Sequence, residues 1–179
     1  MMPHLHLSLQ AGDNLTLKRM QRRHSRADAV AFCATVRQLR PDVVFGADLI
    51  AGFPTETEDM FAGSLGLVDD CGLVFLHVFP FSARPGTPAA RMPQVAGTVV
   101  KERAARLRRQ GALALSRYLE AQIGRDVEVL MEHDHVGRTP GFARMELAAA
   151  APAGRLMSAR VTGLRDWRLQ GEALATCAS

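Results

Sequence analysis

Apolar positions in residues 4–79 switch between strand-like and helix-like spacing. Strand-like runs occupy residues 5–9, 43–50 and 73–79, and helix-like spacing occupies residues 14–20, 25–40 and 56–71. Strands that alternate with helices in this way predict the parallel βα units of an α/β protein. The run at 73–79 is almost entirely apolar, which predicts a strand covered on both faces.

Short polar residues at the expected helix starts support these boundaries. Asp13 or Asn14 precedes the first helix, and Ser25 is followed three residues later by Asp28, which predicts a capping box. Gly72 stands where a left-handed helix terminator is expected.

The stretch 48–58 combines a strand end, a tight turn and a helix start. The apolar run breaks at Gly52 and Pro54, and Thr55 with Glu58 three residues later predicts a second capping box. Such a turn at the carboxyl end of a strand offers backbone N–H groups and close approach to a small molecule. An ordinary βα connection fits the local pattern equally well.

Residues 80–93 predict a long loop rich in proline, serine, glycine and threonine. Within it, Arg84 stands among residues that restrict the backbone. It is either a positioned contact for an anion or an exposed, solvated arginine.

The second half of the chain changes from helical to alternating spacing. Residues 95–123 predict one long helix with a narrow apolar stripe and many arginines. After Gly124, short alternating runs at 126–131, 142–147, 156–161 and 167–173 predict a small β-barrel. Phe142, Arg144 and Arg160 suit base stacking and phosphate contact, with surface solubility as the competing interpretation.

Charge and composition narrow the class of protein. The net charge is +4, with one basic run around Arg22 and Arg23 and a second across residues 103–125. Each run predicts a solvated helix face or contacts to phosphate. With no long apolar segment and no secretory leader, we expect a cytoplasmic protein that does not interact with membranes.

Cysteine spacing predicts no local metal site and no catalytic cysteine. Cys33, Cys71 and Cys177 are far apart and have no cluster-ligand spacing. Cys33 and Cys71 fall at apolar helix positions, which predicts buried small side chains.

Four segments follow one another along the chain: 4–13 (HLHLSLQAGD), 17–22 (LKRMQR), 48–57 (DLIAGFPTET) and 77–90 (HVFPFSARPGTPAA). Together they resemble the tRNA methylthiotransferases, a family of radical S-adenosylmethionine enzymes. The sequences of residues 9–13 (LQAGD) and 77–82 (HVFPFS) are most similar to the branch that modifies threonylcarbamoyladenosine beside the anticodon. The barrel after Gly124 resembles the TRAM domain of this family.

The resemblance implies a fold, a cofactor and a partner. The fold is α/β: the C-terminal part of a partial radical-SAM barrel (1–93), a long basic linker helix (94–123) and a TRAM-like RNA-binding barrel (124–175). The implied cofactor is S-adenosylmethionine, and the implied partner is the anticodon stem-loop of tRNA. Residues implied to bind the cofactor are Ser8, Gln10, Asp48, Ile50, Gly52, Phe53, Pro54, His77 and Phe79. Residues expected at the RNA are Arg22, Arg23, Arg84, Phe142, Arg144 and Arg160.

The sequence departs from the family pattern in two places. The family usually has glycine where Thr55 stands, and we expect Thr55 to stiffen the turn as a better cap. The cysteines that bind two 4Fe-4S clusters in the family are absent. We therefore expect the C-terminal half of such an enzyme, catalytically silent unless its N-terminal half is supplied. The alternatives are a free-standing RNA-binding module and a metabolic barrel fragment that binds a phosphorylated small molecule at Gly52 and Thr55.

Overall fold

The computed structural model describes residues 2–174, and Cys177 lies outside them. Contacts divide the described residues into a unit of residues 5–114 and a unit that contains residues 115–174 and the first residues of the chain. The elements are β1 (His4–Gln10), α1 (Asn14–Arg19), α2 (Arg26–Leu39), β2 (Val44–Ala51), α3 (Glu58–Asp70), β3 (Leu73–Pro80), a 3₁₀ turn η1 (Pro88–Arg91), α4 (Gly97–Glu120), β4 (Asp126–Met131), β5 (Val136–Arg138), β6 (Arg144–Leu147), β7 (Leu156–Arg165) and β8 (Arg168–Ala173).

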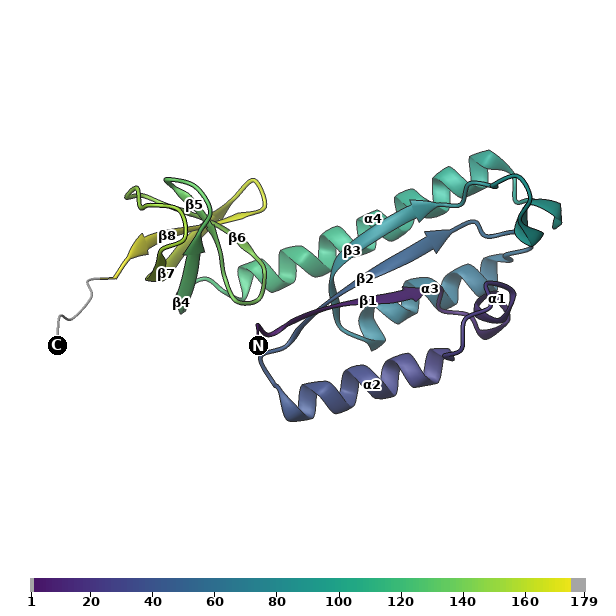
Figure 1. Cartoon of the computed structure of the whole chain (residues 1–179), viewed down its shortest axis with the longest axis horizontal. Coiled ribbons are helices and arrows are strands. Elements are labelled where there is room, and N and C mark those ends of the chain that lie inside the picture. Colours follow the sequence, from purple (N-terminus) through teal and green to yellow (C-terminus); the bar gives the residue numbers. More distant parts are fainter. Residues whose placement is uncertain (1, 175–179) are drawn as a thin grey trace. The chain divides into compact units, whose positions relative to one another are not determined.

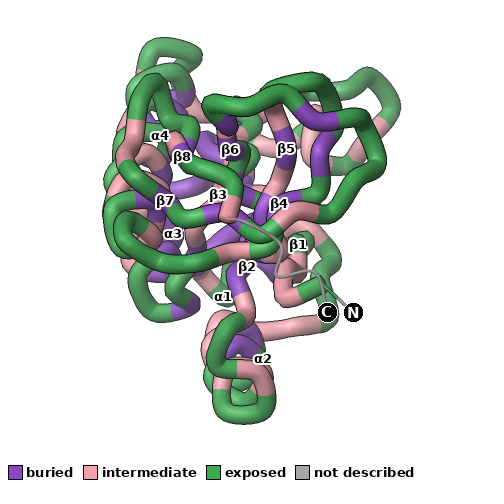
Figure 2. The backbone as a smooth tube through the Cα atoms, turned by 90° about the vertical axis from the view of Figure 1, so that its left-hand side faces the viewer, coloured by how far each residue is buried: buried purple, intermediate pink, exposed green. Residues whose placement is uncertain are grey.

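The first unit is a three-stranded sheet in the order β1-β2-β3. Figure 1 shows the three strand arrows running the same way, and β2 pairs with β3 in parallel. Alternate residues of β1 and β2, such as Leu9, Phe45 and Leu49, enter a core that also contains residues of α2, α3 and α4. Figure 2 marks this core as buried stretches of the tube, most clearly along β2.

The opposite face of the sheet is open, which corrects the expectation for residues 73–79. The side chain of His77 is 65% exposed, and Phe79 is half exposed. β3 is apolar on both faces but packs against helices on one face only. Its apolar sequence therefore does not show that both faces are buried in this chain.

The expected helix caps are confirmed at two of three positions. The Asp13 carboxylate accepts the Thr16 N–H at the start of α1, and Ser25 and Asp28 form the expected capping box of α2. The expected box of Thr55 and Glu58 is wrong, because the N-cap of α3 is Thr57.

Thr55 does not act as a cap. It lies before α3 with φ of 65°, a left-handed conformation that favours glycine, and its hydroxyl donates to the carbonyl of Pro54. The expectation that Thr55 improves the turn as a cap is therefore wrong.

The expected long helix and small barrel are confirmed. Ala104 and Leu107 of α4 are fully buried in the core of the first unit, and Leu119 is buried in the barrel core. The barrel closes in the order β4-β5-β6-β8-β7. The short strand β5 was not expected from the sequence, and Phe142 lies before β6 with a positive φ.

Among residues 2–174, no helix has both the length and the apolar character needed to cross a bilayer.

Candidate functional site

A hollow of about 570 Å³ lies at the carboxyl ends of the three parallel strands. This is the edge of an α/β sheet at which small molecules usually bind. A second hollow of about 310 Å³ shares Gln10, Ile50, Thr87 and Ala89 with the first, so the two adjoin. The larger hollow is lined by Gln10, Asp48, Ile50, Phe79, Pro80, Phe81, Ser82, Arg84, Thr87 and Ala89.

Most residues implied to bind the cofactor gather at these hollows. Gln10, Asp48, Ile50 and Phe79 line the larger hollow, and Phe53 lines the smaller one. The hydroxyl of Ser8 accepts a hydrogen bond from the Gln10 side chain. Gly52 and Pro54 are buried in the turn that follows β2. His77 is not a lining residue of either hollow; it lies next to Asp48 on the open face.

Two of the arginines assigned to RNA also reach this region. Arg84 lines the larger hollow and Arg22 lines the smaller one, whereas Arg23 lines neither. Together, the two adjoining hollows are lined by one carboxylate, two side-chain amides, three phenylalanine rings and three guanidinium groups, which belong to Arg19, Arg22 and Arg84. This set suits a zwitterionic nucleoside or a phosphorylated ligand.

A buried ion pair fixes the turn beside the hollows. One carboxylate oxygen of Glu56 accepts the Gly52 N–H at 2.9 Å and an N–H of Arg103 from α4 at 2.9 Å. The Glu56 and Arg103 side chains are only 1% and 7% exposed. Burial raises the pKa of the Glu56 carboxyl, whereas the Gly52 N–H and Arg103 favour its charged form.

Backbone strain concentrates around the same hollows. Three residues other than glycine have left-handed φ values here: Gln10 at 71°, Gln21 at 57° and Thr55 at 65°. Gln10 and Gln21 line the hollows, and Thr55 ends the turn that carries Phe53. Strained backbone of this kind is often kept where a ligand binds.

A row of polar side chains crosses the open face of the sheet below the larger hollow. The Oδ1 atom of Asp48 lies 2.8 Å from Nε2 of His6 and 3.3 Å from Nδ1 of His77. The row places one side chain on each of β1, β2 and β3.

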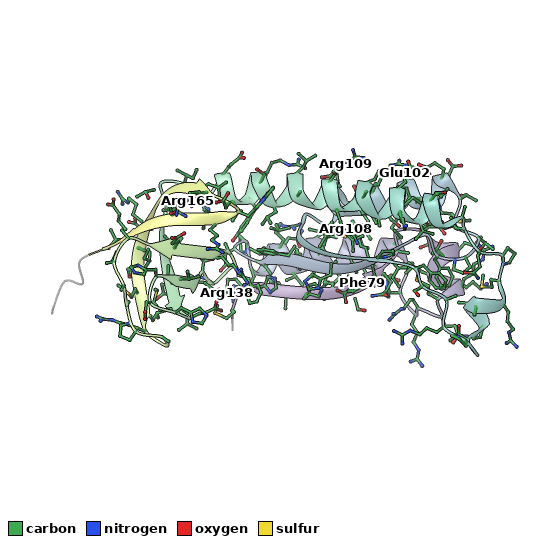
Figure 3. The ribbon with its side chains drawn as sticks, turned by 90° about the horizontal axis from the view of Figure 1, so that it is seen from above. Phe79, Glu102, Arg108, Arg109, Arg138 and Arg165 are labelled. Carbon is green, nitrogen blue, oxygen red and sulfur yellow. The ribbon has the colours of Figure 1, made fainter. Side chains whose placement is uncertain are left out.

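The arginines of α4 divide into paired and exposed groups. Arg103 and Arg106 bind Glu58, and Arg106 lowers the pKa of the Glu58 carboxyl. Arg108 donates to the carbonyl of Val78 on β3, whereas Figure 3 shows Arg109 on the outer side of the helix. Part of the second basic run therefore stabilises the fold.

The barrel arginines assigned to RNA lie on strands that do not pair with each other. Arg144 is on β6 and Arg160 is on β7, and β8 lies between these two strands in the barrel. Arg144 is exposed on β6, and the exposed ring of Phe142 packs beneath the guanidinium of Arg138. Arg160 on β7 makes two hydrogen bonds to Asp126 and lowers the pKa of that carboxyl. This ion pair is exposed, and such a pair contributes little to stability, so the expected contact of Arg160 with phosphate stays a prediction.

Comparison with known proteins shows similarity along most of the chain. A threonylcarbamoyladenosine tRNA methylthiotransferase (MtaB) of Rickettsia prowazekii is 46% identical over 165 residues, 92% of this chain and 39% of the relative. Two tRNA-2-methylthio-N(6)-dimethylallyladenosine synthases, of Bartonella bacilliformis and Jannaschia, are 35% and 42% identical over 96% and 79% of this chain. Its homologues are tRNA methylthiotransferases.

The chain spans about two fifths of the length of the first two of these methylthiotransferases. No family model matches it.

Sequence reasoning missed two features of this methylthiotransferase-like chain. It did not identify the pairing of Glu56 with Arg103, because 47 residues separate them and no local spacing joins them. It also left His6 without a role. The alternation of β1 places His6 on the same face as Ser8 and Gln10, and that alternation was the available signal.

Proposed function

We propose that this chain supplies part of the S-adenosylmethionine pocket and part of the tRNA grip of a tRNA methylthiotransferase. The similarity to such enzymes over 92% of the chain is the observation that carries this proposal. The higher identity to the threonylcarbamoyladenosine enzyme than to the two synthases favours N6-threonylcarbamoyladenosine beside the anticodon as the nucleoside modified. The modification would add a methylthio group to C2 of its adenine.

The residues around the larger hollow fit the implied cofactor. Phe79 offers a half-exposed aromatic face to an adenine, and Ile50 offers an apolar contact beside it. Gln10 and Asp48 offer an amide and a carboxylate to hydroxyl or ammonium groups. When bound with a reduced cluster, S-adenosylmethionine would supply radical chemistry at an otherwise unreactive carbon.

The described residues do not fit an iron–sulfur cluster. Within residues 2–174, Cys33 and Cys71 are both fully buried in the core of the first unit, away from solvent. A cluster needs several thiolates converging on one point. We therefore propose that the clusters are held by another segment, such as the N-terminal half of the enzyme, and that this chain is inactive without it.

The turn and the open sheet face would position the cofactor rather than react. The ion pair of Glu56 and Arg103 holds the Gly52 N–H and the turn in place, so the turn would not need to reorganise when the cofactor binds. Arg84 and Arg22 at the hollow edges would contact the nucleotide backbone as it enters. The barrel, with Phe142 and Arg144 exposed, would hold the stem-loop.

Binding of S-adenosylmethionine to the whole 179-residue chain, measured by isothermal titration calorimetry, tests the cofactor part. Phe79→Ala should weaken binding about tenfold, because base–aromatic stacking contributes about 1–3 kcal/mol. Phe32→Ala is the matched control, since Phe32 is similarly exposed on α2. Equal affinity in both variants would reject Phe79 as part of the pocket.

Binding of an anticodon stem-loop to the same chain, measured by fluorescence anisotropy, tests the RNA part. If about four phosphates are contacted, the logarithm of the association constant should fall with the logarithm of the salt concentration at a slope of about −3. Arg144→Ala should weaken binding, and Arg40→Ala, an arginine paired with Asp42, should not. RNA binding without cofactor binding would favour the free-standing RNA-binding module. If the chain binds neither RNA nor the cofactor, both proposals are rejected.

A further inference from the structure

The polar row on the open sheet face has the composition of a metal site. His6, Asp48 and His77 offer one imidazole nitrogen, one carboxylate oxygen and a second imidazole nitrogen, all within 4.8 Å of one another. Two histidines and one carboxylate are a recurrent ligand set for divalent first-row metals. The three side chains come from three different strands, so the sheet itself sets their spacing.

The fold gives the row its position. Asp48 and His77 are register partners in the parallel pair β2–β3. A Cβ atom at Gly46, two residues before Asp48, would lie 2.6 Å from Nδ1 of His6. The glycine therefore leaves room for the His6 ring to lie over β2, with its Nε2 atom at Asp48. The rings of His6 and His77 have centroids 4.6 Å apart.

We propose that His6, Asp48 and His77 form a binding site for a divalent transition metal ion of the Zn²⁺ class. Zn–N and Zn–O bonds of about 2.0–2.2 Å at tetrahedral angles place ligand atoms about 3.3 Å apart. The two distances to Asp48, 2.8 Å and 3.3 Å, are already close to this value. The hydrogen-bonded pair of His6 and Asp48 must lengthen by about 0.5 Å, and the two imidazole nitrogens must approach each other by at most about 1.5 Å from the 4.8 Å limit.

The side chains can make this adjustment cheaply. His77 is 65% exposed, so its ring can turn toward His6 without disturbing the core. Three protein ligands leave a fourth position open on the solvent side of the sheet, where a water or a ligand atom would complete the site. Asp48 also lines the larger hollow, so a bound ion would stand at one wall of that hollow.

This site does not depend on the proposed function, because metal binding needs neither S-adenosylmethionine nor tRNA. The test uses the whole 179-residue chain without a polyhistidine tag. Calorimetry with Zn²⁺ should show one equivalent bound, and Co²⁺ should give the visible absorption of a four-coordinate ion. Zn²⁺ affinity should fall at least about tenfold in each of three variants, His77→Gln, His6→Gln and Asp48→Asn. Changes to residues that only support a metal ligand already cost about 10–100-fold in metal affinity, so the loss of a ligand should cost at least the lower value.

The double variant His133→Gln/His135→Gln is the matched control, because it removes two histidines from the barrel and none from the row. It should bind Zn²⁺ as the unaltered chain does. Thermal melts with and without Zn²⁺ separate binding from folding. The melting temperature should rise with Zn²⁺ in the unaltered chain and in the control, but not in His77→Gln, whose exposed side chain is not needed for folding.

Two results would overturn the proposal. One is the absence of Zn²⁺ binding to the folded chain. The other is Zn²⁺ binding that survives His77→Gln but is lost in the His133→Gln/His135→Gln control, which would place the ion on the barrel.

Discussion

Thr55 provides the sharpest test of how the turn beside the hollow is built. Its φ of 65° is left-handed, a conformation that costs a residue with a Cβ about 1–2 kcal/mol. Branching at Cβ makes threonine one of the least suitable residues there. We therefore expect Thr55→Gly to stabilise the chain.

The size of the gain follows from opposing terms. Glycine removes the left-handed penalty of about 1–2 kcal/mol, but its greater freedom in the unfolded chain costs about 0.5–1 kcal/mol. The hydrogen bond from the Thr55 hydroxyl to Pro54 is made to the adjacent residue, and water can replace it in part. These terms leave a net gain of about 0–1.5 kcal/mol, and its midpoint of about 0.7 kcal/mol corresponds to about 3 °C in the melting temperature of a unit of this size.

A short series of variants separates the backbone term from the hydroxyl. Asparagine tolerates the left-handed region and lacks the entropic cost of glycine, so Thr55→Asn should also stabilise. Thr55→Val keeps the branch and loses the hydroxyl, so it should destabilise. Urea unfolding followed by far-ultraviolet circular dichroism measures all three. If Thr55→Gly and Thr55→Asn both have a lower free energy of unfolding than the unaltered chain, the backbone at Thr55 is not strained.

Three further changes test the site and the barrel. Gly12→Ala should cost about 1–3 kcal/mol in unfolding free energy, because its Cβ would lie 2.2 Å from the Gly63 carbonyl oxygen on α3. Glu56→Gln should cost about 3 kcal/mol, because the buried Arg103 would lose its close carboxylate and keep only the longer contact to the exposed Glu58; Glu56→Gln/Arg103→Met should recover much of that loss. Asp126 has a lowered pKa because of its hydrogen bonds to Arg160, so its contribution to stability is present above its ordinary pKa and is lost as pH falls through the lower pKa of the folded state. Asp126→Asn should therefore flatten the acid end of the stability profile, measured by thermal melts from neutral to acidic pH.

Matched controls make these outcomes decisive. Gly97→Ala adds a methyl group where no atom lies within 4 Å, so it should not destabilise as Gly12→Ala does. For the ion pair, a double variant no more stable than Glu56→Gln alone would show that the loss of the Glu56 carboxylate from the buried Arg103 does not cause the destabilisation. For the barrel, Arg160→Gln should flatten the same acid range, and an unchanged profile would contradict the assigned cause of the pKa shift.

The order of elements could be predicted because it depends on local patterns. Within residues 2–174, period-two spacing located seven of the eight strands to within a few residues, and missed only the three-residue β5. Asp13 and Ser25 act within three residues, so their caps were visible in the sequence. Thr55 and Thr57 both suit a cap by composition, and only the backbone angles distinguish them.

The site was predicted in part, because its residues come from ends of strands that the fold brings together. The candidates Gln10, Asp48, Ile50 and Phe79 meet at one hollow because parallel strands end at one edge. The contact between Glu56 and Arg103 depends on where α4 crosses the turn, which no spacing in the sequence records.

The open face of β3 depends on a single residue that sequence periodicity could not locate. Phe45 pairs with Leu73, but Gly46 pairs with Phe75, so Val74 is inserted into the ladder. Without that insertion, Asp48 would pair with Leu76, and His77 would point into the core, because a shift of one residue turns every side chain to the other face. The insertion instead turns Leu76 and Val78 into the core and places His77 beside Asp48. β3 is apolar except for His77, so either register would bury apolar side chains. The bulge, and not the hydrophobic pattern, therefore decides which face of the sheet His77 lies on.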